Sequence, residues 1–128
     1  MKLSELIENN NKMESFKTFC RHDAKETETI LKFLISTAKK PLKNVTDYTD
    51  TGRIVKRAPN DRVLWEMLGD ISNFTYKHCG VFLSALVLKK GGKDVGNGIF
   101  DIVAENGLLV EDRLEFLFKQ IAACHKAA

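Results

Sequence analysis

The sequence predicts a helix-dominated α+β fold, a single domain of 128 residues with a small two- or three-stranded sheet. Several long segments carry apolar residues at helical spacing, and one apolar run, 81–88, has the length of a buried strand. The composition, 44% hydrophobic and 29% charged, is that of a globular chain long enough to bury a core. We expect an N-terminal helical segment (1–23) and a main body (24–128). Helices followed by a strand would also suit a winged-helix-like module.

The N-terminal third is predicted to be helical. Residues 4–20 indicate one or two short helices that break at the asparagines 9–11, and Ser4 can cap the first. A longer helix is predicted over 24–39, because apolar residues recur at i, i+1, i+4, i+5 and i+8 from Ile30. Pro41 ends this helix.

The middle of the chain holds the clearest helix, predicted over 61–77. It has a continuous apolar stripe, Asn60 as its N-cap and Gly80 just past its end. Trp65 lies off that stripe, so we expect this helix to make contacts on two sides. Before it, the β-branched pair within 53–57 predicts a short strand.

The last third is predicted to contain a buried strand (81–89), a short helix (99–106) and a final helix (111–125). A lone strand cannot satisfy its backbone groups, so it needs a partner. We expect 53–57 to be that partner, with strand pairing across a fold-back homodimer as the alternative. The final helix is expected to face inward through Leu114, Leu117, Phe118 and Ile121.

Basic residues are concentrated in one part of the sequence. Seven lie between positions 39 and 62, against three acids, in a chain whose net charge is only +3. Such clustering is typical of proteins that contact the phosphates of nucleic acids. The expected contacts are Lys39, Lys40, Lys43, Arg53, Lys56, Arg57, Arg62, Lys89, Lys90 and Lys93.

A glycine-rich connection links the predicted strand to the next helix. Backbone N–H groups at a helix N-terminus attract anions, so Gly96 and Gly98 are candidate anion-binding positions. The segment matches neither the P-loop nor the dinucleotide-binding fingerprint. A plain turn, in which glycine serves only the backbone, is the alternative.

One stretch resembles a group of small, uncharacterised bacterial proteins. The likeness covers 62–104 and depends on an Arg-led amphipathic helix, Gly80, the Leu-Ser-Ala strand at 83–85, and the Gly-x-Gly-x-aromatic helix start at 96–100. The resemblance implies a coherent unit of helix, strand and loop, and it implies no activity.

The favoured function is therefore a non-enzymatic bacterial or mobile-element protein that binds nucleic acid through phosphates. The first alternative is a protein–protein interaction module (an inhibitor, immunity or regulatory protein) with Trp65 and Phe100 as anchors. The second is a nucleotide- or phosphate-handling enzyme that uses the 91–98 loop. No catalytic residue is identified.

We expect this protein not to belong to several other classes. No apolar run reaches the roughly 20 residues of a membrane span, and no signal-peptide pattern is present, so we expect a cytoplasmic protein. Three cysteines is an odd number, which argues against a disulfide framework. The cysteines and histidines lack zinc-site spacing, so neither a metal nor a cofactor is expected.

Overall fold

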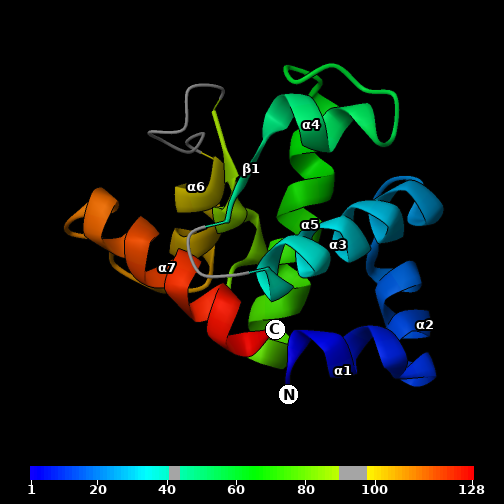
Figure 1. The fold of residues 1–128 in the computed structure, drawn as a ribbon, viewed down its shortest axis with the longest axis horizontal. Coiled ribbons are helices and arrows are strands. Elements are labelled where there is room, and N and C mark those ends of the chain that lie inside the picture. The colour runs from blue at the N-terminus through cyan, green and yellow to red at the C-terminus, as the bar shows by residue number, and fades with distance from the viewer. Residues whose placement is uncertain (41–43, 90–97) are drawn as a thin grey trace.

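Helices dominate the computed structural model, which describes residues 1–40, 44–89 and 98–128 (Figure 1). The fold is α+β, with a two-stranded parallel sheet. The elements are α1 (Leu3–Glu8), α2 (Asn10–Phe19), α3 (Ala24–Lys39), β1 (Thr46–Asp47), α4 (Tyr48–Arg53), α5 (Arg62–Cys79), the 3₁₀ helix η1 (Leu83–Leu86), β2 (Val87–Leu88), α6 (Gly98–Glu105) and α7 (Arg113–Ala127).

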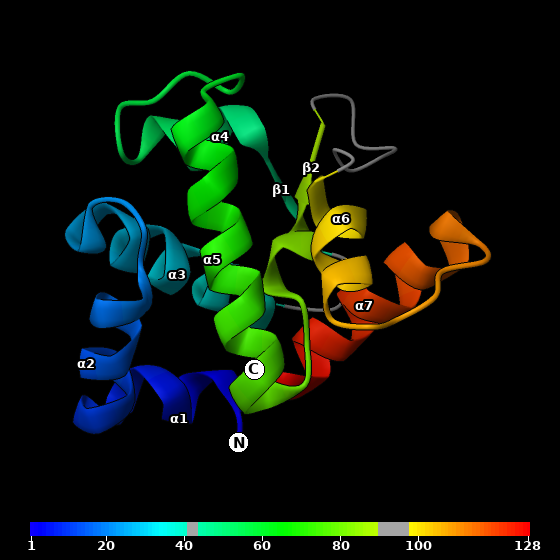
Figure 2. The ribbon, with the colours of Figure 1, turned by 180° about the vertical axis from the view of Figure 1, so that it is seen from behind.

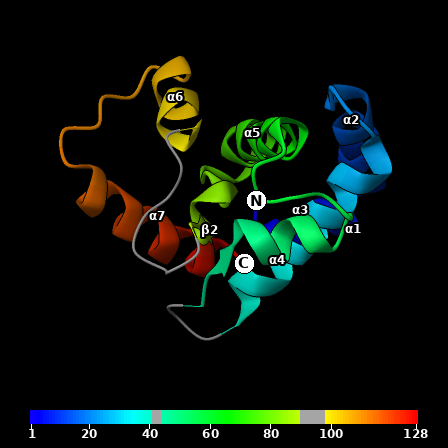
Figure 3. The ribbon, with the colours of Figure 1, turned by 90° about the horizontal axis from the view of Figure 1, so that it is seen from above.

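The long helix α5 lies at the centre of the molecule. Seen from above, it lies between α6 on one side and the α1–α3 group on the other (Figure 3). The buried residues form two hydrophobic clusters, a larger one among α1, α2, α3 and α5 and a smaller one between α6 and α7. The chain ends lie close together at the foot of α5 (Figure 1).

Helix boundaries follow short polar caps. Asn9 interrupts the first predicted helical segment because its side chain accepts a hydrogen bond from Lys12 N, which starts α2. The predicted cap of α5 is wrong by one residue: Asp61, not Asn60, accepts from Val63 N at 2.8 Å. Ser4 lies inside α1 and does not cap it. Gly80 ends α5 in the left-handed conformation, with φ +75°.

The predicted strand over 81–89 is mostly wrong. Its first half folds as η1, and only Val87 and Leu88 are extended. Every residue from 81 to 88 is buried. The apolar side chains of this run are divided between the two hydrophobic clusters with a period of three residues rather than two. Phe82, Ala85 and Leu88 join the smaller cluster, whereas Leu83 and Leu86 join the larger one. Three residues per turn is the period of a 3₁₀ helix, and a wholly apolar run conceals it.

The predicted strand at 53–57 is also wrong. Arg53 ends α4, and the amides of Val55 and Arg57 both donate to Gly52 O, at 3.1 and 2.9 Å, which forms a turn. The partner of β2 is β1, with Thr46 beside Val87. The described sheet is a parallel pair rather than a hairpin. The winged-helix-like architecture stays a prediction.

Helix α7 faces inward through fewer residues than its sequence predicts. Leu117 is buried, but Leu114 and Phe118 are 55% and 62% exposed, so their inward assignment is wrong. The side chain of Phe116 instead turns toward Phe100, with ring centroids 6.2 Å apart. None of the described helices is both long and apolar enough to cross a membrane.

Candidate functional site

The described members of the predicted phosphate-binding set lie at several separate places in the fold. Arg57 contacts Glu26 near the start of α3, whereas Lys39 and Lys40 lie at the end of that helix, about 20 Å away by helical rise. Lys40 and Arg53 line a shallow depression. Lys89 and Gly98 line a different cavity. Lys43, Lys90, Lys93 and Gly96 lie outside the described residues.

Three of the predicted cations are paired with acids. Arg57 Nε lies 3.1 Å from Glu26 Oε1, and its Nη1 lies 3.2 Å from Asp61 Oδ2. These hydrogen bonds, Glu26 first, raise the pKa of the Arg57 guanidinium. The Val63 amide lowers the pKa of the Asp61 carboxyl most, and the Arg57 contact lowers it further. Arg53 and Arg62 make longer contacts with the neighbouring acids Asp50 and Glu66.

A cavity of about 680 Å³ lies among α4, α5 and α6. From behind, β2 and α6 stand beside α5, and α4 lies at the upper end of α5 (Figure 2). The volume is within the usual range for small-molecule sites. Its apolar lining includes Trp65, Leu68, Ile99 and Ile102, and its polar lining includes Tyr48, Thr49, Asn60, Ser84, Lys89 and Asp101.

Trp65 forms part of the cavity wall, and a hydrogen bond links its indole to the turn before α5. Its indole Nε1 donates to Pro59 O at 2.9 Å, yet the residue is 52% exposed. It is also the single tryptophan of the chain. A large aromatic side chain that is hydrogen-bonded and half-exposed provides apolar contact area, and its two side-chain torsions lose little conformational entropy on binding.

Ser84 lines the same cavity from η1 and is 7% exposed. The Ser72 hydroxyl of α5 donates to Ser84 Oγ at 2.5 Å and accepts from Ser84 N at 2.9 Å. The two serines therefore join η1 to α5 at the edge of the cavity.

The described residues around Trp65 carry no excess of positive charge. The cavity and an adjoining hollow share Trp65, Gly69, Gly98 and Ile102. Together the described linings hold three bases and four acids: Arg21, Arg62 and Lys89 against Glu66, Asp70, Asp101 and Glu105. Such a balance does not favour a polyanion.

Phe100 does not lie where an interface anchor is expected. The residue is 9% exposed, and its ring packs in the smaller cluster beneath the Arg113 guanidinium, 4.5 Å from the ring centroid. Its role as a partner anchor is therefore corrected to core packing. Trp65 keeps the exposure that an anchor needs.

The cysteines show no sign of activation. Burial raises the pKa of the Cys20 thiol to about 11 and that of Cys124 to about 12. All three thiols are free. Among the described residues, no three His, Cys, Asp or Glu side chains lie close enough together to hold a metal ion.

Sequence reasoning identified only part of this cavity. Trp65 is signalled by its position off the apolar stripe, and Lys89 and Gly98 by the glycine-rich connection. The cavity residues that sequence reasoning missed are Tyr48, Thr49, Pro59, Asn60, Leu68, Gly69, Ser84, Ile99, Asp101 and Ile102. They come from separate elements that only the fold brings together.

Comparison with known proteins found no significant relative of this chain. No family model matches the chain, and neither the curated proteins nor the solved structures gave a significant match.

Proposed function

We propose that this protein is a non-enzymatic binding module whose cavity among α4, α5 and α6 receives a small, mainly apolar ligand. The observation that carries the proposal is the cavity of about 680 Å³ with the hydrogen-bonded, half-exposed Trp65 in its wall. Ligand sites are usually concave and apolar, with a few polar groups that orient the ligand, and this lining fits that description.

This proposal replaces phosphate contacts as the favoured function because of the charges. The described cations are spread over separate surfaces, and Arg57 is held by two carboxylates. An acyl-transfer enzyme would need a base beside its nucleophile. Ser84 instead bonds to another serine, so its surroundings support binding rather than such catalysis.

The neutral naphthalene dye prodan tests the proposal, with energy transfer from the single Trp65 as the readout. We expect saturable binding, a blue shift of the dye and transfer that declines when an apolar competitor such as indole is added. If the emission of prodan remains that of the free dye in water at all accessible protein concentrations, the proposal is overturned.

A blocking variant tests whether the dye occupies this cavity. A Cβ built on Gly98 meets nothing within 4 Å among the described residues, so Gly98→Leu is expected to fold and to place a larger side chain at the cavity lining. Ala122→Leu, on the exposed side of α7, is the matched control. We expect Gly98→Leu to abolish transfer and Ala122→Leu to keep it. Equal dye binding by both variants would contradict the assignment.

A gel shift with duplex and single-stranded DNA separates this proposal from the earlier one. Absence of a shift at low salt together with prodan binding supports the cavity. A shift that weakens steeply with salt, and that Lys40→Gln and Arg53→Gln reduce, would restore phosphate contacts as the function.

A further inference from the structure

We propose that the exposed side of α7 is an interface at which two copies of this chain pair in antiparallel orientation. The inference does not depend on the proposed function, because α7 contributes nothing to the described lining of the cavity. It depends on two apolar residues that the fold leaves outside its core and on the order of the charges beside them.

Leu114 and Phe118 provide the apolar part of this surface. Each is more than half exposed, and neither belongs to the two hydrophobic clusters of the described chain. Because they are four residues apart, they lie next to each other on the helix. A partner that covers both would remove apolar area from water without taking any side chain out of the core.

The first half of α7 is the accessible half. The helix begins at the outer edge of the molecule and runs back toward its centre (Figure 1, Figure 3). Its second half is bound to the body, since the His125 ring lies 2.8 Å from Ala38 O at the end of α3 and 2.8 Å from Asn44 O. A partner helix therefore has most room around Leu114 and Phe118.

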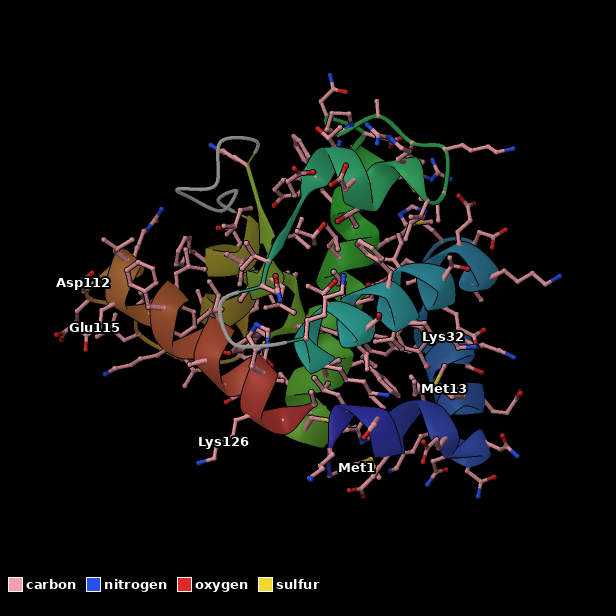
Figure 4. All side chains as sticks on the ribbon, viewed as in Figure 1. Met1, Met13, Lys32, Asp112, Glu115 and Lys126 are labelled. Carbon is pink, nitrogen blue, oxygen red and sulfur yellow. The ribbon has the colours of Figure 1, made fainter. Side chains whose placement is uncertain are left out.

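Charged side chains follow a fixed order along this half of α7. Asp112 and Glu115 come first and lie together at the outer end of the helix (Figure 4), and Lys119 follows them. Glu115 and Lys119 form an ion pair at 2.7 Å, so an acid and a base stand side by side on the surface. The other base, Arg113, lies over the Phe100 ring.

A second copy of the chain fits this surface because the pattern complements itself. In a two-fold dimer the same patch is used by both copies, so Leu114 of each copy can meet Phe118 of the other when the helices run antiparallel. That arrangement brings Lys119 of each copy close to Asp112 and Glu115 of the other, with opposite charges nearest. A parallel pairing would instead set the acids of both copies side by side.

Sedimentation equilibrium of the full chain tests the interface. Half of a 15-residue helix buries less than the roughly 1,200–2,000 Å² of a standard stable interface, so we expect weak, reversible dimers. The concentration range should extend to about 1 mM, where even weak association is measurable. A chain that stays monomeric throughout would overturn the inference and leave this face for a different protein.

An exchange of charges tests the antiparallel order. Glu115→Lys and Lys119→Glu each place like charges together across the dimer, so we expect each variant to dimerise at least about fivefold more weakly than the wild type. In an equimolar mixture the exchanged charges complement each other, and we expect tighter association than in either variant alone. Lys126→Glu, near the other end of α7 (Figure 4), is the control and should dimerise like the wild type. A mixture no tighter than its components would refute the antiparallel pairing.

Phe118→Gln tests the apolar contact. We expect this variant to be monomeric at concentrations where the wild type dimerises, with an unchanged urea midpoint for the monomer because Phe118 is exposed. Ile54→Gln, which changes an exposed apolar residue at the end of α4, is the matched control and should still dimerise. Dimerisation of Phe118→Gln at wild-type strength would overturn the proposal. Prodan binding is expected to persist in Phe118→Gln, so the dimer and the cavity stand or fall separately.

Discussion

At the scale of single residues, the buried carboxylate of Asp70 joins two distant parts of the chain. It accepts hydrogen bonds from Arg21 Nε at 2.8 Å and from Arg21 N at 3.0 Å. Arg21 also donates to Glu66 O at 3.1 Å. The turn before α3 is thereby bound to the middle of α5. A carboxylate that is 3% exposed needs this cation, because an unpaired buried charge is costly.

Arg21→Gln should lower the free energy of unfolding by about 2 kcal/mol. The value is below that for fully buried pairs because the Arg21 side chain is 54% exposed and its amide still binds Asp70. Urea denaturation measures the effect. Arg53→Gln, which removes an exposed contact to Asp50, serves as the control and should cost less than about 0.5 kcal/mol. Equal losses in the two variants would show that the Asp70 pair is not special.

His78 gives a pH dependence with a defined sign. Burial, followed by the nearby charges of Lys12 and Lys77, lowers the pKa of His78 below its ordinary 6.5. The unfolded chain therefore binds a proton at a higher pH than the native chain does. The loss of stability that His78 causes is absent well above pH 6.5. This loss grows as the pH falls through 6.5 toward the pKa of His78 in the native state.

We expect the wild type to lose stability between about pH 7.5 and about pH 5.5, and His78→Gln to lose less over the same interval. Urea midpoints measured at both pH values provide the comparison. The neutral His78 ring also packs on Phe74, with centroids 4.4 Å apart, so the variant starts from a lower stability. Only the difference in slope tests the titration, and parallel pH profiles would disprove it.

At the scale of elements, hydroxyl groups of α5 replace a neighbouring strand for the apolar run 81–88. Thr75 Oγ1 donates to Val81 O at 2.8 Å and accepts from Leu83 N at 3.3 Å. The Ser72 hydroxyl accepts from Ser84 N in the same way. These side chains satisfy backbone groups that would otherwise need a sheet, so the run can form a 3₁₀ turn in the core.

Thr75→Val keeps the volume of this side chain but leaves Val81 O and Leu83 N without their partner. We expect a loss of about 2 kcal/mol in the free energy of unfolding and faster hydrogen exchange at Leu83. Thr29→Val, an exposed hydroxyl that donates to Lys25 O on α3, is the matched control and should change stability by less than about 0.5 kcal/mol. If Thr75→Val is as stable as Thr29→Val, this account is contradicted.

The helices other than α4 could be predicted from the sequence, and the 3₁₀ segment could not. Amphipathic periodicity places α3 and α5 correctly because one face of each meets the core. The run 81–88 is apolar on every side, so periodicity carries no information there. Its conformation depends on Ser72 and Thr75, whose hydroxyls look on the sequence like ordinary polar interruptions of a helix.

At the scale of the whole molecule, tertiary packing decides which predicted residues meet. The basic cluster is continuous in the sequence, but α3 separates Lys39 from Arg57 by most of its length. The cavity shows the reverse, since Tyr48, Trp65, Ser84 and Ile102 are far apart in the chain and line one space. A local count of charges therefore does not by itself show that the cations share one surface. Only long-range contacts assemble the cavity.

The most direct test of the cavity as a ligand site is a heteronuclear NMR titration of the labelled protein with indole, the apolar competitor of the dye test. The account predicts saturable shifts that concentrate on the Trp65 indole N–H, on the amides of Ser84 and Lys89, and on Ile99 and Ile102. Shifts that remain linear in ligand concentration, or that concentrate on the exposed face of α7 around Leu114 and Phe118, would contradict it.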